Sequence, residues 1–405
     1  MWQLPPYFVY IVFSVSFFIS FFFLIVYAKR KLWKKEFNGE FKEITFIMPA
    51  YNCEKVLSEA VESVKKANYP QEKISIIIIN DGSKDKTLQV AKELEKKYER
   101  IIVLDKKNSG KADSVNYGIK RATTELVVLL DGDTIIKKDI LEKAIPMFSD
   151  ESTAAVTSRL KPINRSRLIE NLQYVEYTLS GLHRMLIGEL NSLPDAPAFT
   201  IYRREFFKRY GYFDTENLTE DFEMGLRVQK NDYNVGYVAN SCAITDVPDT
   251  IAKLFRQRLR WSYGNFYNYW KYKKMIFNRK YGDLGLFVMP AGLMSIFLMS
   301  IVLIFGFLSV IDWIIIHIRM IEAGWAPAID IEISHVILYL FDLRILLFIF
   351  AICLALFIFF LAKHETGEDI KVWHYFVFVT VYLWFLAFAY LVSIGFFILN
   401  KKPKW

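Results

Sequence analysis

The chain has 405 residues, of which 53% are hydrophobic and 35 are Phe, and its formal net charge is +8. This length exceeds that of one ordinary core and allows a catalytic domain together with a membrane domain. Because most of the surplus positive charge borders apolar runs, we interpret it as membrane orientation and headgroup contact, and no nucleic-acid partner is expected. The three cysteines are far apart, which argues against a disulfide framework or a zinc cluster.

The first predicted element is a membrane anchor within residues 1–35. Residues 7–28 form an apolar run long enough to cross a hydrocarbon core of about 30 Å as a helix. Basic residues follow this run instead of preceding it, which argues against a cleaved signal peptide. By the positive-inside rule, the N-terminus is outside the cell and the domain that follows, residues 36–250, is cytosolic.

This second domain begins with alternating strands and helices. Short, β-branched apolar runs predict buried strands at residues 44–48, 74–79, 101–104 and 126–130. Helical spacing with charged outer faces predicts helices at residues 55–67, 85–97 and 111–122. The alternation predicts an α/β fold with a mostly parallel sheet, which binds its ligands at the carboxyl ends of the strands.

Acidic residues stand at the ends of two of these strands. Asp81 follows the second strand, and Asp131 and Asp133 follow the fourth, with Gly132 between them. A divalent cation between Asp131 and Asp133 would neutralise the phosphates of a nucleotide sugar and stabilise the departing diphosphate. A single Asp would be interpreted as a helix cap. Two at the ends of strands expected to be neighbours, with a third at Asp133, favour a nucleotide site instead, in which Asp81 accepts hydrogen bonds from the base or ribose.

The helix that starts near Lys111 offers a phosphate contact. Residues 108–110 (Asn-Ser-Gly) precede it, so that backbone N–H groups and the Lys111 ammonium would face an anion. A plain helix cap followed by a solvent-exposed lysine is an equally good interpretation of these residues alone.

A second acidic motif follows at residues 219–221, Thr-Glu-Asp. Thr219 is placed to cap a helix over residues 220–229, with Glu220 and Asp221 in its first turn. Transfer to a hydroxyl needs its proton removed, and a positioned carboxylate accelerates such a step by about 10²–10⁴-fold. We expect Asp221 to be this base, beside Glu220 in the catalytic motif. A capping motif with acidic first-turn residues is the alternative.

Residues 251–282 are predicted to form an amphipathic helix at the membrane surface. Gln257, Arg260 and Trp261 lie on one face of this helix. The guanidinium of Arg260 would bind a leaving diphosphate, and the indole of Trp261 would stack on a sugar ring. The alternative is a helix whose Arg and Trp contact only headgroups. Residues 166–190 are predicted to form a further helix that lies on the bilayer.

Residues 283–405 contain three more apolar runs, at 284–311, 344–362 and 373–399. They predict transmembrane helices, with residues 333–341 on the outer face. Four crossings would leave the C-terminal lysines outside, against the positive-inside rule, whereas two crossings within the run 284–311 would place them inside.

The order and spacing of these motifs resemble the membrane-embedded family 2 glycosyltransferases, which include hyaluronan, cellulose, chitin and poly-N-acetylglucosamine synthases and the ceramide glucosyltransferases. The resemblance covers residues 44–264 and rests on Pro49-Ala50-Tyr51-Asn52, Asn80-Asp81-Gly82-Ser83, Gly110-Lys111-Ala112, Asp131-Gly132-Asp133-Thr134, Thr219-Glu220-Asp221 and Gln257-Arg258-Leu259-Arg260-Trp261. It implies a GT-A-like fold, a UDP-sugar donor, Mg²⁺ or Mn²⁺, and inversion at the anomeric carbon.

The resemblance also implies roles for the matching residues. The donor would be bound by Tyr51, Asp81, Lys111, Asp131 and Asp133, with the metal held by Asp131 and Asp133. The leaving diphosphate and the acceptor sugar would be bound by Gln257, Arg258, Arg260 and Trp261.

The expected function is that of a processive synthase in the cell membrane, which extends a β-linked polysaccharide and passes it through its own helices. Its partners would be a UDP-sugar, the growing polysaccharide or a lipid acceptor, and membrane lipids. One alternative is transfer of a single sugar to a membrane lipid. Another is a non-catalytic membrane scaffold or transporter, against which the intact set of acidic residues argues.

Overall fold

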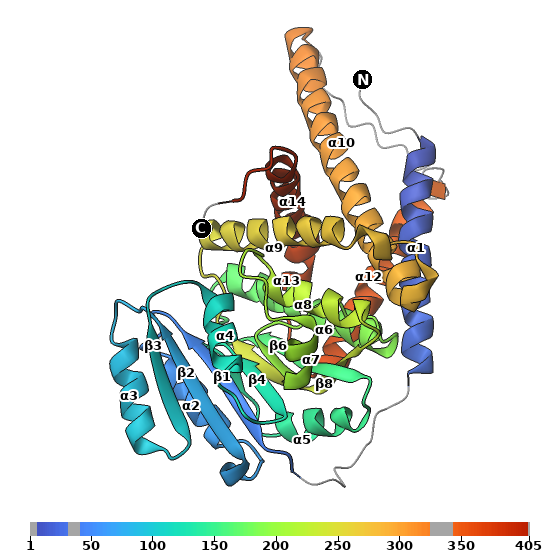
Figure 1. Ribbon diagram of the computed structural model, residues 1–405. Coiled ribbons are helices and arrows are strands. Elements are labelled where there is room, and N and C mark those ends of the chain that lie inside the picture. The colour runs from blue at the N-terminus through green and yellow to red at the C-terminus, as the bar shows by residue number, and fades with distance from the viewer. Residues whose placement is uncertain (1–5, 31–40, 325–342, 404–405) are drawn as a thin grey trace.

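The computed structural model describes residues 6–30, 41–324 and 343–403. Figure 1 shows an α/β domain on one side of the molecule and long helices on the other, with α9 (Ile251–Lys271) between them. The predicted positions of residues 31–35, residues 333–341 and Lys404 lie outside the described residues.

Within the described residues, the α/β domain contains an eight-stranded sheet in the order β3-β2-β1-β4-β7-β6-β8-β5. The strands are β1 (Ile44–Ala50), β2 (Ile74–Asp81), β3 (Ile101–Lys106), β4 (Leu126–Leu130), β5 (Ile135–Ile136), β6 (Thr153–Pro162), β7 (Phe199–Arg203) and β8 (Asn234–Thr245). Strands β3, β2, β1 and β4 are parallel, as are β6 and β8, and β7 is antiparallel to its neighbours. The predicted α/β fold with a mostly parallel sheet is confirmed.

The helices of this domain connect and cover the strands. They are α2 (Leu57–Lys65), α3 (Thr87–Lys97), α4 (Lys111–Ile119), α5 (Ile140–Ala144), α6 (Leu168–Glu189), α7 (Arg204–Tyr210) and α8 (Glu220–Lys230), with short 3-10 turns at η1 (Gln71–Lys73) and η2 (Ile145–Ser149). The five helices predicted within residues 36–250 are all present and differ from their predicted bounds by a few residues at most.

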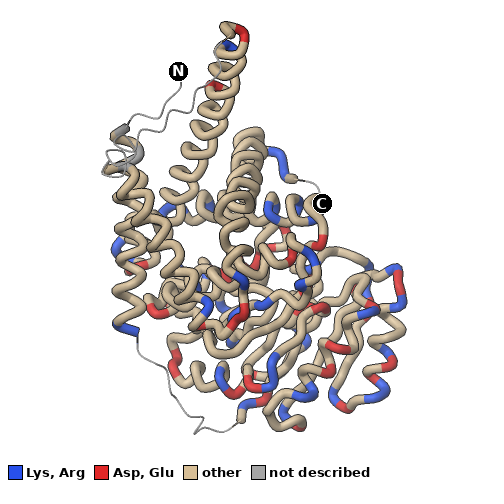
Figure 2. Tube along the Cα trace, turned by 180° about the vertical axis from the view of Figure 1, so that it is seen from behind, with Lys and Arg blue, Asp and Glu red and all other residues tan. Residues whose placement is uncertain are grey.

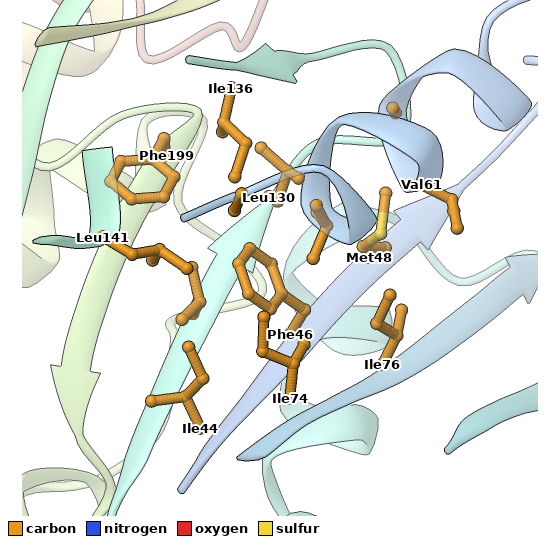
Figure 3. Close-up of a cluster of buried hydrophobic side chains, with 14 of the residues drawn as sticks. Ile44, Phe46, Met48, Val61, Ile74, Ile76, Leu130, Ile136, Leu141 and Phe199 are labelled. Atoms are coloured by element: carbon orange, nitrogen blue, oxygen red, sulfur yellow. The ribbon is translucent and has the colours of Figure 1, made fainter. Parts of the chain in front are cut away.

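Strand β1 is buried on both faces, as its continuous apolar sequence predicts. Phe46 and Met48 point into the cluster that Figure 3 shows, where they meet Val61 of α2. Ile47 points to the opposite face and joins a second cluster with α4. Burying a side chain of this kind contributes about 1.5–3 kcal/mol, so the central strands anchor the ends that carry the acidic residues.

Four helices in the described parts of the chain are long and apolar enough to cross a membrane: Tyr10–Lys29, Leu284–Glu322, Ile345–Thr366 and Val372–Ile398. They correspond to α1 (Pro6–Lys29), the π-helical turn η5 (Leu284–Val288) with α10 (Met289–Glu322), α12 (Leu343–Thr366), and α13 (Val372–Val377), η6 (Phe378–Tyr382) and α14 (Leu383–Ile398). Figure 2 shows few charges along these helices. The run 284–311 lies in one continuous helix, so the alternative of two crossings within it is wrong.

Helices α1 and α12 end together at one side of the molecule. Arg30, directly after α1, lies 2.8 Å from the carboxylate of Glu365 near the end of α12. The hydroxyl of Tyr27 donates to the same carboxylate at 2.5 Å. The basic flank that predicted the orientation of α1 is therefore paired with a carboxylate of another apolar helix.

Both ends of the last apolar helix contact the α/β domain. Before it, the buried carboxylate of Glu368 accepts from Arg159 at 2.6 Å and from Lys161 at 2.8 Å. After it, the ammonium of Lys402 lies 3.2 Å from the carboxylate of Glu216. Polar contacts before and after it therefore hold the last apolar helix against the α/β domain.

Helix α6 joins the sheet to the apolar helices. Its residue Arg184 faces Tyr237 of β8, and Leu172 and Val175 pack in one cluster with Phe359 of α12. Other parts of the protein therefore cover these two sides of α6. The sequence, by contrast, predicted that this helix lies on the bilayer. The prediction used only the apolar periodicity of α6, which does not distinguish a lipid surface from a protein one.

Candidate active site

A pocket of about 270 Å³ opens at the carboxyl ends of β1, β2 and β4. It is lined by Pro49, Ala50, Tyr51, Cys53, Asp81, Asn108, Gly110, Lys111, Asp131, Gly132 and Asp133. The chain adds β2 and β3 on one side of β1 and then β4 on the other, so the pocket lies at the topological switch point of the sheet. Five predicted donor-binding residues thus line one pocket. Because β1 separates β2 from β4, however, Asp81 and Asp131 do not end neighbouring strands as expected.

Asp81 is already bonded by the protein. Its carboxylate, 4% exposed, accepts from the backbone N–H groups of Ser109 and Gly110, both at 3.0 Å. It also accepts from the ammonium of Lys106 at 2.9 Å. The N–H groups of Ser109 and Gly110, which the sequence assigned to phosphate, are therefore engaged by Asp81. The contact of Asp81 with a base or ribose stays a prediction.

The ammonium of Lys111 lies 2.7 Å from the carboxylate of Asp131. Burial alone lowers the pKa of Lys111, but the negative charges of Asp131 and Glu220 outweigh burial and raise the pKa. Lys111 is therefore a cation in the middle of the site and is placed to meet an anionic group.

The positive charge near the carboxylate of Asp133 is not enough to keep its pKa at the ordinary value. Burial raises its pKa, and the nearby charge of Asp131 raises it further. Gly132 lets the two aspartates fold closely against β1, because a Cβ at this position would lie 3.0 Å from the carbonyl oxygen of Pro49. A cation between Asp131 and Asp133 would relieve their mutual repulsion.

The residues present fit a divalent cation of the Mg²⁺ or Mn²⁺ type. Among the residues that the structure describes, no group of three or more His, Cys, Asp or Glu side chains could hold a metal ion. Asp131 and Asp133 are the one or two carboxylates that would hold such a cation. This is the usual share where the phosphates of the substrate and water complete the coordination shell.

A second, narrower pocket of about 20 Å³ adjoins the first and contains the predicted base. It includes Glu220 and Asp221 and shares Pro49, Lys111 and Asp131 with the first pocket. Burial raises the pKa of Glu220, as does the charge of Asp221, whereas Lys111 and then Arg260 lower it. Arg260 is thus a residue of the Gln257–Trp261 motif whose charge reaches Glu220.

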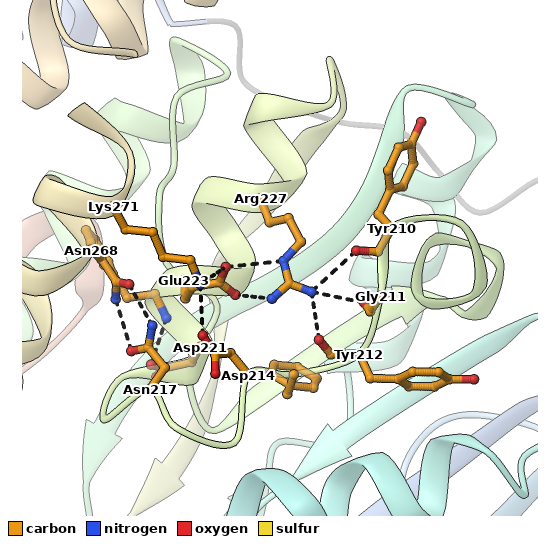
Figure 4. Close-up of polar contacts among 12 residues, drawn as sticks. Tyr210, Gly211, Tyr212, Asp214, Asn217, Asp221, Glu223, Arg227, Asn268 and Lys271 are labelled. Atoms are coloured by element: carbon orange, nitrogen blue, oxygen red, sulfur yellow. Dashed lines mark hydrogen bonds and ion pairs between the residues drawn. The ribbon is translucent and has the colours of Figure 1, made fainter. Parts of the chain in front are cut away.

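The N-terminus of α8, which carries Glu220 and Asp221, is held by α9. Thr219 precedes α8 as predicted, but its side chain does not cap the helix. Instead its hydroxyl accepts from the amide of Asn268 in α9 at 3.0 Å, and Asn268 exchanges hydrogen bonds with Asn217, which Figure 4 shows. The predicted cap is wrong because this tertiary contact takes the Thr219 hydroxyl.

A second set of contacts ties α8 to the end of α9. The carboxylate of Glu223, 1% exposed, lies 2.5 Å from Arg227 and 3.1 Å from Lys271, and accepts from the Tyr272 hydroxyl at 2.6 Å. Arg227 in turn donates to the carbonyl oxygens of Gly211 and Tyr212 in the loop before α8 (Figure 4). These contacts fix the base motif to the helix that carries the Gln257–Trp261 motif.

None of the five residues of the Gln257–Trp261 motif is among those that line the two pockets. Arg258 is buried and lies 2.6 Å from the carboxylate of Glu176 in α6. Its guanidinium donates to the side chain of Gln257 at 2.6 Å and lies 4.2 Å from the ring centre of Trp261. Arg258 therefore contacts side chains of the protein itself. The predicted contact of Arg258 with an acceptor or diphosphate stays a prediction.

Sequence reasoning did not identify the residues that support the site. Asn268 and Glu176 each stand among several other polar residues of α9 and α6, and Tyr382 lies within an apolar run. The sequence therefore does not distinguish them from polar residues that face solvent. A buried polar group requires a partner, but the sequence does not say which one.

An α/β sheet with carboxylates gathered at its switch point, attached to long apolar helices, defines a membrane-associated enzyme class that handles phosphorylated substrates. Residues 42–264 match glycosyltransferase-like family 2. Because this match covers more than half of the chain, the protein belongs to glycosyltransferase-like family 2 and is a glycosyltransferase.

Two relatives are named poly-β-1,6-N-acetyl-D-glucosamine synthase. The relative from Staphylococcus epidermidis is 32% identical over 240 residues, which are 58% of this chain and 57% of the relative. The relative from Staphylococcus aureus (strain COL) is 32% identical over 230 residues, which are 56% of this chain and 55% of the relative. The chain thus matches little more than half the length of these curated relatives.

A solved structure shares the fold over most of the chain. The mannosyltransferase PcManGT from Pyrobaculum calidifontis, solved in complex with GDP-Man and Mn²⁺, aligns with a TM-score of 0.56 and 16% sequence identity. The alignment covers 90% of this chain and 99% of the mannosyltransferase. The predicted GT-A-like architecture, with the sheet joined to apolar helices, is confirmed.

Proposed function

We propose that this protein transfers a sugar from a UDP-sugar to an acceptor hydroxyl with inversion at the anomeric carbon, and that it thereby extends a β-linked polysaccharide. The observation that carries the proposal is the pair of adjoining pockets. One contains Asp131 and Asp133, the other contains Asp221, and Lys111 borders both. A donor diphosphate and an acceptor hydroxyl placed in these pockets would meet at Lys111.

The first pocket is suited to the nucleotide end of the donor. Tyr51 is 48% exposed at its rim and offers a ring on which a base can stack. Asp131 and Asp133 would hold Mg²⁺ or Mn²⁺, which supplies positive charge to the departing diphosphate. The ammonium of Lys111 provides a second positive charge beside the same oxygens.

The second pocket, of about 20 Å³, has room for the acceptor hydroxyl group beside Asp221. As the acceptor oxygen attacks the anomeric carbon, the bond from that carbon to the diphosphate breaks and UDP leaves. The carboxylate of Asp221 receives the hydroxyl proton. Attack from the face opposite to the leaving group inverts the anomeric carbon.

The relatives favour a particular substrate. Both are named for a polymer of N-acetylglucosamine in β-1,6 linkage, which supports UDP-N-acetylglucosamine as the donor. The long apolar helices support synthesis in the cell membrane with transfer of the product across it. The basic flank at Arg30, on the side of the α/β domain, supports a cytosolic site.

The experiment is a donor screen with the full-length protein in detergent or vesicles. UDP-N-acetylglucosamine with Mn²⁺ or Mg²⁺ is expected to give UDP and a high-molecular-weight product, and a chelator is expected to stop both. UDP-glucose and GDP-mannose are the comparison donors. A single glycolipid as the product would contradict polymer synthesis and support the alternative, transfer of one sugar to a membrane lipid. Absence of nucleotide release from every donor would contradict the proposal.

A further inference from the structure

The guanidinium of Arg258 connects three helical elements. From α9 it lies 2.6 Å from the carboxylate of Glu176 in α6 and 3.4 Å from the hydroxyl of Tyr382 in η6. The Tyr382 hydroxyl donates to the same carboxylate oxygen at 2.7 Å. Arg258 and Tyr382 are 4% and 3% exposed. Glu176, Arg258 and Tyr382, which we call the anchoring triangle, thus join the last apolar helix to the α/β domain.

The anchoring triangle reaches Gln257 directly. Nη1 of Arg258 donates to Oε1 of Gln257 at 2.6 Å. A guanidinium has only donors, so it can bond the amide oxygen of Gln257 but not the amide nitrogen. Arg258 therefore sets the orientation of the Gln257 amide. The amide N–H donors of Gln257 point away from Arg258.

The same guanidinium also restricts Trp261. Its carbon lies 4.2 Å from the ring centre of Trp261, within the range of a cation–π contact. With one face of the indole covered in this way, a sugar ring can stack only on the opposite face. Arg258 thus sets how both Gln257 and Trp261 are presented.

Two features indicate that the anchoring triangle is more than a packing contact. Buried ion pairs contribute little net stability compared with apolar residues of similar volume. In addition, Nε of Arg258 is buried and has no hydrogen-bond partner among the described residues, which adds to the cost of burying the guanidinium. If this ion pair served only stability, its replacement by apolar side chains of similar volume would be neutral or would raise the free energy of unfolding.

The position of Tyr382 depends on a π-helical turn. Tyr382 is the last residue of η6, between α13 and α14. A π turn inserts one residue and so rotates the following part of the helix by roughly 100°. Such turns are frequent at functional sites.

We propose that Glu176 and Tyr382 are positioning residues for the acceptor and diphosphate contacts of the enzyme: through Arg258 they fix the amide of Gln257 and the indole of Trp261. The inference deepens the proposed function and rests on it, together with the predicted contacts of Gln257 and Trp261 with the acceptor and the diphosphate. It links the last apolar helix to the orientation of these two side chains.

The test uses Tyr382→Phe and Glu176→Gln in the full-length protein, with UDP-N-acetylglucosamine, Mn²⁺ and a soluble oligomer of N-acetylglucosamine as acceptor. The loss of one hydrogen bond to a positioning group is expected to raise KM for the oligomer roughly fivefold. The rate of donor hydrolysis without acceptor is expected to stay within about twofold of the wild type.

Tyr375→Phe is the matched control. Tyr375 lies in α13, and its hydroxyl donates to the carbonyl oxygen of Ala355 at 2.9 Å, away from Arg258. The same chemical change is made in the same apolar helix. KM for the oligomer is expected to remain unchanged.

A second measurement does not require turnover. The affinity for UDP with Mn²⁺, measured by calorimetry, is expected to fall roughly fivefold in Tyr382→Phe and to be unchanged in Tyr375→Phe. If Tyr382→Phe and Glu176→Gln lower thermal stability but leave both KM and UDP affinity as in the wild type, the anchoring triangle is only structural and the inference is wrong. A wild-type protein that neither turns over nor binds UDP would instead contradict the proposed function.

Discussion

At the scale of single residues, the site combines groups whose charges depend on one another. Burial raises the pKa of both Asp133 and Glu220, and the positive charge of Lys111 offsets this only in part. Lys111 also pairs with Asp131. The charge state of each of these groups therefore depends on the others.

Asp221→Asn tests the base. The change keeps the shape of the side chain but removes its ability to accept a proton, so transfer is expected to fall by at least about 10²-fold. UDP release with the proposed donor and thermal unfolding in detergent are the measurements, and the unfolding temperature is expected to stay unchanged. Asp232→Asn, in the exposed turn after α8 and outside both pockets, is the control and should retain activity. Normal turnover in Asp221→Asn would show that another group is the base.

The acidic site residues could be predicted from the sequence, but their hydrogen-bond partners could not. Asp81, Asp131 and Asp133 are recognisable because they follow strands that are close to each other in sequence. The engagement of Asp81 by Ser109 and Gly110 depends on how the loop before α4 folds back onto β2. The spacing of residues along the sequence does not show how this loop folds back onto β2.

At the scale of elements, the orientation of α8 is set by α9. Asn268 holds Thr219, and Gly264 permits the close packing, since a Cβ on Gly264 would lie 2.2 Å from the Thr219 hydroxyl oxygen. The base motif and the Gln257–Trp261 motif therefore move as one unit. The periodicity of α9 predicts the helix but not the neighbour against which it packs.

Gly264→Ala tests this packing. The added methyl group must displace Thr219 or α9, which is expected to cost about 1–3 kcal/mol in the free energy of unfolding and to reduce transfer. Gly395→Ala in α14 is the control, because a Cβ there meets no atom within 4 Å. Thermal unfolding and UDP release are measured on both variants. Unchanged activity in Gly264→Ala would mean that the position of α8 is set by other contacts.

The predicted bounds of the strands and helices in residues 44–130 agree well with the structure, because each depends on local periodicity. The positions of α6 and of the last apolar helix do not follow from periodicity. An apolar helix face is the same signal whether lipid, the sheet or α9 covers it. Helix α14 packs along α9 through rings such as Phe397 against Tyr263 and Phe266, and only the tertiary structure shows this.

At the scale of the whole molecule, the membrane helices are joined to the α/β domain by buried polar groups. Glu368, between α12 and α13, accepts from Arg159, Lys161 and the Tyr174 hydroxyl. Burial alone raises the pKa of Glu368, but these hydrogen bonds outweigh burial and lower the pKa below its ordinary value of 4.5. The cluster therefore contributes stability as long as Glu368 is ionised.

Glu368→Gln is expected to lower the free energy of unfolding by about 3 kcal/mol, because it leaves Arg159 buried without its counter-ion. Since the pKa of Glu368 is lowered on folding, this contribution is complete above pH 4.5 and is lost as the pH falls through the lower folded value. Thermal unfolding at neutral pH and across the acidic range measures both effects. Asp369→Asn is the control, since the Asp369 side chain is 95% exposed. Equal stability of the two variants at neutral pH would contradict this account.

The contact of Lys402 with Glu216 has a practical consequence. Glu216 lies in the short loop that leads into Thr219 and the predicted catalytic residues, so Lys402 rests against the approach to the predicted base. An affinity tag or fluorescent fusion appended to that end would be crowded against this loop. A long, flexible spacer ahead of the tag would keep the purification handle from disturbing the enzyme that it is meant to isolate.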